Sequence, residues 1–206
     1  MVEKRREKWL HATMLYTRKG DSGTTKAFDS GPGERMSKSS CQTEALGALD
    51  ELNSFLGLVK VKFSKAAWSK NVTAGSGIDT KTPAHLIHWI QNCLFTVQAE
   101  VAGADKRIAP EKVPAMESVI DAIEKQLPPI KSFFISGGTE LAALLDISRT
   151  LARKAERRAI AAVEAKDIVL AEPTLAFLNR LSSLLYALAR LTNHKSGIKE
   201  LPPTYE

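Results

Sequence analysis

The sequence predicts an all-α fold, a five-helix antiparallel bundle, from two observations. Five segments repeat apolar residues at helical spacing, and no segment alternates apolar and polar residues as a convincing strand would. Glycines, prolines and hydroxyl residues gather between these segments, where helices end. With 206 residues, 44% of them hydrophobic, the chain can bury one substantial core. We expect a basic N-terminal segment at 1–13, the bundle at 14–195 and a flexible tail at 196–206.

Net charge and cysteine content restrict the classes of protein. The chain carries 29 Lys and Arg against 23 Asp and Glu, a net charge of +6, which permits a nucleic acid or a polyanionic small ligand as partner. No run of about 18 apolar residues exists and no apolar stretch follows the charged start, so we expect a soluble protein of the cytoplasm, or of the mitochondrial matrix if the source is eukaryotic. Cys41 and Cys93 lack the spacing of a zinc site and are expected to be free thiols.

A loop rich in glycine and hydroxyl residues, 15–25, precedes the first expected helix. Gly20 permits close approach of backbone to a ligand, and Arg18 and Lys19 supply positive charge, so the loop is suited to wrap a triphosphate. The alternative is an ordinary polar turn. The chain holds no G-x-x-x-x-G-K-[ST] string, so this is not a Walker A loop.

Three helices are expected before residue 130. Apolar periodicity places the first at about 43–63, the second at about 84–102, and a short third at 116–127, where two prolines end it. His85 and His88 lie one turn apart near the start of the second helix. No third ligand appears nearby, so surface or capping histidines are favoured over a metal site.

The fourth helix, about Leu141 to Val163, carries the main functional signal. At about 100° per residue its apolar residues form one stripe, and its arginines form a second stripe beside it. The apolar stripe holds Leu141, Leu145, Ala152, Ala155, Ala159 and Ala162; the second holds Arg149, Arg153, Glu156 and Arg157. Guanidinium groups pair with phosphate oxygens two bonds at a time, so the second stripe predicts a polyphosphate site. The alternative is a solvated charged face, and Lys154 and Arg158 point elsewhere.

Two aromatic residues, Phe133 and Phe134, lie in the connection before this helix, and Thr139 is suited to cap the helix. One ring is expected in the core, and the other either joins it there or meets a flat ligand. The last helix, about Pro173 to Asn193, has a leucine face. A polar stripe lies beside that face and holds Asn179, Ser182, Ser183, Tyr186 and Arg190.

Five motifs in a fixed order make the chain similar to a known family. They are Tyr16 to Gly23, Gly47 to Ser54, Ser136 to Thr139, Arg149 to Arg157 and Phe177 to Ser182. Together they resemble the PduO-type ATP:cob(I)alamin adenosyltransferases over about residues 14 to 193. The resemblance implies a five-helix bundle that assembles as a homotrimer, with active sites between adjacent subunits. It also implies transfer of the 5′-deoxyadenosyl group of ATP to the cobalt of cob(I)alamin, forming adenosylcobalamin and releasing triphosphate.

The resemblance also implies roles for individual residues. Asp50 and Arg149 resemble a pair that forms a salt bridge between subunits, and Phe133 resembles an aromatic residue that packs under the corrin where an axial ligand would otherwise sit. The resemblance implies that two residues take part in catalysis, Phe133 and Arg153. The positions that resemble the ATP-contacting set are Thr17, Arg18, Lys19, Gly20, Thr25, Lys38, Arg153, Lys154, Glu156, Arg157 and Asn179. Mg²⁺ is implied on the ATP phosphates, with no metal site of the protein's own.

Several residues depart from the family pattern. Lys154 stands where a second consecutive Arg is common, Ser136 where Pro is common, Asp146 where His is frequent, and Ser183 and Tyr186 where Asp and Phe are usual. The preference for cobalamin is therefore left open.

Implied partners are a flavoprotein reductase and an adenosylcobalamin-dependent enzyme, with no nucleic acid and no membrane. From the residues alone, a basic nucleic-acid-binding module and a structural oligomerisation module stay as alternatives. The Gly/Thr loop and Asn179 favour the ATP site, because a binder of phosphate backbone needs neither.

Overall fold

The computed structural model describes residues 16–28, 30–63, 77–78 and 82–205. These residues form five helices and two strands of two residues each. The helices are α2 (Cys41–Phe63), α3 (Pro83–Val101), α4 (Lys112–Glu124), α5 (Glu140–Glu164) and α6 (Glu172–Lys195); the strands are β1 (Thr24–Thr25) and β2 (Met36–Ser37). The expected all-α bundle is confirmed, and the expected basic segment 1–13 lies outside the described residues.

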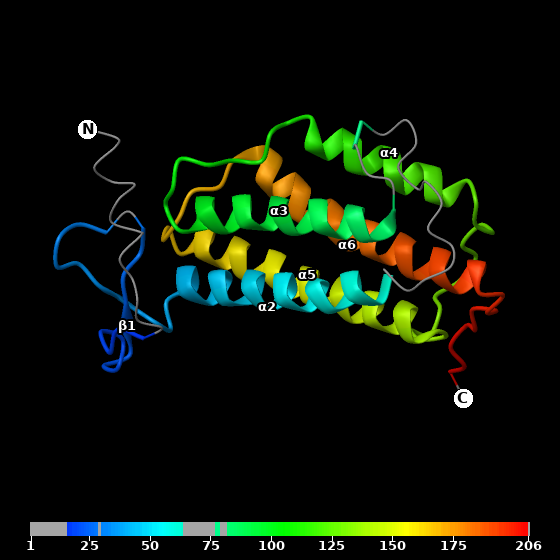
Figure 1. Cartoon of the computed structure of the whole chain (residues 1–206), viewed down its shortest axis with the longest axis horizontal. Helices are drawn as coiled ribbons and strands as arrows, with labels where there is room; N and C mark the ends of the chain where they lie inside the picture. Colours follow the sequence, from blue (N-terminus) through cyan, green and yellow to red (C-terminus); the bar gives the residue numbers. More distant parts are fainter. Residues whose placement is uncertain (1–15, 29, 64–76, 79–81, 206) are drawn as a thin grey trace.

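The helices pack side by side, and successive helices run in opposite directions along the long axis (Figure 1). α5 packs between α2 and α6, while α3 packs on α2 and α4 packs on α6. The two strands pair antiparallel at one end of the bundle, and the connection before α5 and the C-terminal segment lie at the other end (Figure 1). The bundle therefore presents two separate ends where irregular backbone can build a site.

Local chemistry explains where the helices begin. The Thr82 hydroxyl accepts a hydrogen bond from His85 N at the start of α3 (3.3 Å), and the Thr139 hydroxyl accepts one from Ala142 N at the start of α5 (3.1 Å). The predicted Thr139 cap is confirmed. α4 begins before the expected Met116 because Pro114 lies in its first turn, where the missing N–H would have no helical partner.

The core lies between the five helices, and α5 contributes small side chains to it. Leu145 and the alanines of the predicted apolar stripe are buried, whereas Leu141 at the start of the stripe is half-buried. Alanine at these positions lets the backbone of α5 come close to α2 and α6. The predicted buried face of α5 is confirmed, so its charged residues must lie on its flanks and outer side.

Enlarging a side chain in this closely packed face should destabilise the bundle. Ala155 is fully buried, so Ala155→Leu should lower the free energy of unfolding by about 1–3 kcal/mol through overpacking. Ala165→Leu makes the same change at the exposed C-cap of α5 and is the control. Equal urea-denaturation midpoints for the two variants would contradict the packing of α5 described above.

Candidate functional site

The Gly/Thr loop is held in shape by two basic side chains from the segment that follows it. Lys38 Nζ donates to the carbonyl of Gly20 (2.9 Å). The Arg35 guanidinium donates to the carbonyls of Lys19 (2.5 Å) and Thr24 (2.8 Å) and to the hydroxyl of Thr24 (2.7 Å). Sequence reasoning identified Lys38 but missed Arg35, since a single arginine beside a turn carries no periodic signal. Hydrogen bonds from the protein's own side chains therefore define the shape of the loop.

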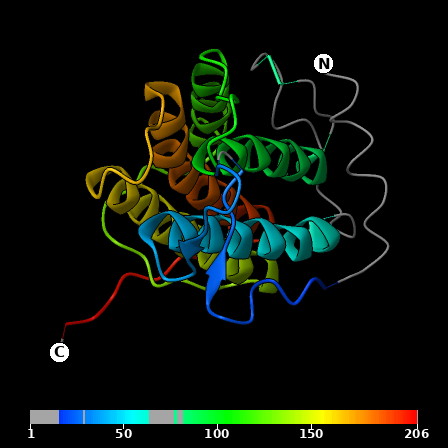
Figure 2. The same cartoon turned by 90° about the vertical axis from the view of Figure 1, so that its left-hand side faces the viewer.

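This loop covers the end of the bundle that Figure 2 shows face on. Just after β1 it reaches the end of α3, where Phe28 N donates to the carbonyl of Ala102 (3.2 Å). A cavity of about 500 Å³ lies between the loop, α2 and α5. Its lining combines hydroxyl, acidic and basic groups: Thr25, Lys38, Thr43, Glu44, Glu51, Lys154 and Arg158. Three residues of the predicted ATP set thus meet here.

The two cations that α5 adds to this loop cavity both have acidic partners on α2. Lys154 Nζ pairs with Glu51, and the Arg158 guanidinium lies 3.8 Å from a carboxylate oxygen of Glu44. Both pairs are partly exposed to solvent, so their contribution to stability is small. The α2-facing flank of α5 is therefore close to neutral.

The other predicted ATP residues of α5 lie on its opposite flank and outer side. Glu156 accepts a hydrogen bond from Asn179 Nδ2 (2.9 Å), which joins the charged stripe of α5 to the polar stripe of α6. Arg153 and Arg157 are exposed, and neither has an ion-pair partner within the described ranges. The structure brings these four residues together but separates them from the loop. The predicted ATP set is thus divided between two sides of α5.

A second cavity, of about 430 Å³, lies at the opposite end of the bundle. Its wall comes from α5, α6 and the connection 130–136, with one residue from the C-terminal segment. Among its lining residues are Phe133, Phe134, Asp146, Arg149, Arg153, Ser183, Tyr186 and Arg190. Four of the five departures from the family pattern line this cavity: Ser136, Asp146, Ser183 and Tyr186. These four departures therefore share one cavity, at the end of the bundle away from the Gly/Thr loop.

The two aromatic rings of the connection both line this cavity. The Phe133 side chain is 80% exposed. Phe134 is half-buried, and the guanidinium carbon of Arg190 lies over its ring, 5.2 Å from the ring centre. The expectation that one of them joins the core is wrong, because the connection runs across the end of the bundle and not between helices. An exposed phenyl ring at a cavity offers a flat ligand an apolar contact.

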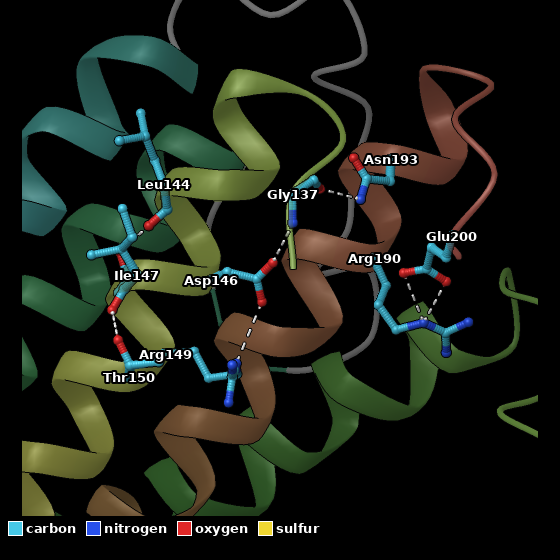
Figure 3. A network of polar contacts seen from close by, with 10 residues as sticks. Gly137, Leu144, Asp146, Ile147, Arg149, Thr150, Arg190, Asn193 and Glu200 are labelled. Carbon is cyan, nitrogen blue, oxygen red and sulfur yellow. Dashed lines mark hydrogen bonds and ion pairs between the residues drawn. The ribbon is translucent and has the colours of Figure 1, made fainter. Parts of the chain in front are cut away.

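Arg149 is engaged within its own chain. Its Nε donates to Asp146 Oδ1 (3.4 Å; Figure 3). Its guanidinium lies 5.9 Å from the centre of the Tyr186 ring. Asp50 is exposed on α2 and is not brought to Arg149.

Burial raises the pKa of Tyr186, an effect that the neighbouring Arg190 partly offsets. The Tyr186 phenol is therefore protonated at neutral pH and available as a hydrogen-bond donor.

Two side chains hold the turn before α5: Asn193 comes from α6, and Asp146 comes from α5 itself. Asn193 donates to the carbonyl of Gly137 (2.8 Å) and accepts from Thr139 N (3.1 Å), while buried Asp146 accepts from Gly137 N (3.3 Å; Figure 3). Gly138 has φ +96°, and a Cβ there would lie 2.4 Å from the Asn193 amide oxygen. Only glycine fits at this position.

No metal centre is formed by the part of the chain that the structure describes, since it contains no group of three or more His, Cys, Asp or Glu side chains placed to hold an ion. Both cysteines are free, as expected. Burial raises the pKa of the Cys93 thiol, and Lys112, 3.5 Å away, partly offsets this.

Among the described helices, none has the length and apolar character needed to span a membrane.

The close contact at Gly138 gives a test of the turn. Gly138→Ala should lower the free energy of unfolding by about 1–3 kcal/mol more than Gly137→Ala, since the added methyl group collides with Asn193. Gly137 also has a positive φ but has nothing within 4 Å of its Cβ position, so it controls for backbone strain. The difference should shrink in an Asn193→Ala background when measured by urea denaturation; an unchanged difference would exclude this contact as its cause.

Comparisons with known proteins agree on one family. The family model for cobalamin adenosyltransferase matches residues 15–192. The chain is 36% identical over 191 residues to a corrinoid adenosyltransferase of Bacillus subtilis, covering 91% of this chain and 90% of that protein. It is 38% identical over 189 residues to the corrinoid adenosyltransferase PduO of Citrobacter freundii, covering 87% of this chain, and it spans about half (50%) of that protein's length.

A solved structure resembles the whole bundle. It is a variant PduO-type ATP:corrinoid adenosyltransferase from Lactobacillus reuteri, complexed with cobalamin and ATP. The two chains superpose with a TM-score of 0.77 at 26% sequence identity, covering 93% of this chain and 97% of the other.

Proposed function

The chain belongs to the cobalamin adenosyltransferase family, and we propose that it transfers the 5′-deoxyadenosyl group of ATP to the cobalt of cob(I)alamin and releases triphosphate. One observation carries the proposal: exposed Arg153 lines a cavity that presents the Phe133 ring, and exposed Arg157 follows one helical turn further along α5. Guanidinium groups without acidic partners suit a triphosphate, and the apolar ring suits the face of a corrin. The similar Lactobacillus reuteri protein was solved with both of these ligands.

The division of the ATP residues supports a site built by two copies of the chain. Thr25 of the loop and Lys38, which donates to the loop, lie on one side of α5, whereas Arg153, Arg157 and Asn179 lie on the other. A homotrimer, in which the loop of one copy faces the α5–α6 flank of its neighbour, would reunite them. In such an assembly Arg149 and Asp50 would meet across the same boundary.

The chemistry requires little of the protein beyond positioning and charge. Cob(I)alamin attacks the 5′ carbon of ATP, a cobalt–carbon bond forms, the carbon–oxygen bond breaks, and its electron pair leaves with the triphosphate. Arg153, Arg157, Lys19 and Lys38 would neutralise the leaving charge in a fixed geometry. A Mg²⁺ would be held mainly by phosphate oxygens and water, because the described residues offer it no cluster of acidic ligands.

Phe133 has a proposed role on the cobalt side. Its ring projects from a connection whose following turn is fixed by Asp146 and Asn193, so the ring is held without being packed in the core. Placed under the corrin, it would exclude an axial ligand from that face. Loss of the axial ligand from Co(II) makes reduction to Co(I) easier, so the ring would promote formation of the nucleophile.

Removal of the Arg153 guanidinium should impair transfer without unfolding the bundle. Arg153→Ala should lower kcat/KM by about 10²- to 10³-fold, since a charge-assisted contact to the leaving triphosphate is lost. Its thermal midpoint should stay close to that of the wild type, because the side chain is exposed and has no ion-pair partner among the described residues. Arg107→Ala, an exposed arginine in the α3–α4 connection, is the matched control. Normal turnover by Arg153→Ala would refute the phosphate assignment.

Phe133 can be tested by varying the starting oxidation state of cobalt. Phe133→Ala should slow conversion that begins from cob(II)alamin and a mild reductant far more than conversion from chemically prepared cob(I)alamin, because only the former depends on excluding the axial ligand. The 80% exposure of the side chain predicts a small effect on stability. Phe95→Ala on the outer side of α3, 65% exposed, is the control. Equal losses from both starting states would leave Phe133 without this role.

A further inference from the structure

One buried arginine, Arg190, links α6 to two other segments at the cobalamin end of the bundle; Figure 3 shows its contact with Glu200. The side chain of Arg190 on α6 is only 5% exposed. Its Nε donates to both carboxylate oxygens of Glu200 (2.9 and 3.3 Å), and its terminal nitrogen donates to the carbonyl of Pro128 (3.2 Å). Its guanidinium also lies over the Phe134 ring. Arg190 therefore contacts the connection after α4 at two points, Pro128 and Phe134, and the C-terminal segment at Glu200.

Burial of this charge is costly unless its partners are kept in place. Removing a guanidinium from water carries a large desolvation cost, which the carboxylate and the carbonyl offset only while both stay within hydrogen-bond distance. An apolar side chain would fill the same space in α6, where Leu188 and Leu191 are buried, without that requirement. The buried ion pair therefore specifies position more than it adds stability.

A second contact, at the residue after Glu200, holds the C-terminal segment against the aromatic connection. The carbonyl of Leu201 accepts a hydrogen bond from Ile135 N (2.9 Å). The side chain of Glu200 is 18% exposed and lines the cavity beside Phe134. The sequence predicted a flexible tail at 196–206, and it could not reveal these two contacts.

We propose that Arg190 and Glu200 are positioning residues that hold the aromatic connection, and with it Phe133, at the cobalamin cavity. The exposed Phe133 ring has no core packing of its own, so its place depends on its backbone. That backbone is anchored before Phe133 by the hydrogen bond of Arg190 to the Pro128 carbonyl. After Phe133 it is anchored by the contact of Arg190 with the Phe134 ring and by the hydrogen bonds of Gly137. The C-terminal segment thus contributes Glu200 to the cavity wall and helps to keep the Phe133 ring in position. This inference rests on the proposed function, because it assigns the pair to the step in which Phe133 acts.

The test variant is Glu200→Gln, which keeps the shape of the side chain and removes its charge. Hydrogen exchange of the full-length protein provides a readout that needs no catalysis. Within 130–136 the Ile135 amide is the one that the described residues hold in a hydrogen bond, to the Leu201 carbonyl, and it should exchange about tenfold faster or more when the Glu200 contact is lost. Conversion from cob(II)alamin should fall several-fold more than conversion from cob(I)alamin, with the KM for ATP unchanged. Glu200→Asp should recover part of both effects. Lys199→Gln, an exposed neighbour, should change neither.

The outcomes separate this inference from the proposed function. Failure of the wild-type chain to form adenosylcobalamin would refute the function, and with it the catalytic role of the pair. An active wild type with unchanged exchange at 130–136 in Glu200→Gln would overturn the inference alone. Equal rate losses from both cobalt states, together with a lowered thermal midpoint, would also overturn it, because that is the result expected of a merely structural ion pair.

Discussion

Burial of the alanine face of α5 between α2 and α6 is the constraint on which the rest of the structure depends. Alanine side chains bring these three helices close together, so α5 can place charged groups only on its two flanks and its outer side. One flank carries Lys154 and Arg158 toward the Gly/Thr loop, and the other carries Arg149 and Arg153 toward α6. Two chemically different cavities follow from one packing arrangement.

The two flanks differ in how their charge is compensated. Lys154 and Arg158 have acidic partners on α2, whereas Arg153 and Arg157 have none in the part of the chain that the structure describes. Positive charge without a partner attracts anions, so the uncompensated side is the one suited to a triphosphate. The apolar ring of Phe133 lies at the same cavity as Arg153, which places the two proposed ligands next to each other.

Sequence patterns predicted the elements whose chemistry repeats along the chain. The 3.6-residue period located the helices and both stripes of α5, and the hydroxyl of Thr139 predicted its cap. The contacts of Arg35, Asn193 and Glu200 were not predicted, because they join irregular backbone to side chains at other points of the chain and follow no period. The core position expected for one of the two phenylalanine rings was wrong for the same reason. The expected pairing of Asp50 with Arg149 involves two copies, so a single chain cannot display it.

The central claim is that one active site combines the loop of one copy with the arginine flank of another, and subunit exchange tests it most directly. Lys38→Ala disables only the loop and Arg153→Ala only the flank, so each variant alone should be inactive. After exchange of the two variants in equal amounts, about a quarter of the sites should pair an intact loop with an intact flank. Adenosylcobalamin formation should then recover to roughly a quarter of the wild-type rate. Persistent inactivity, with exchange verified by mass, would contradict a site shared between copies.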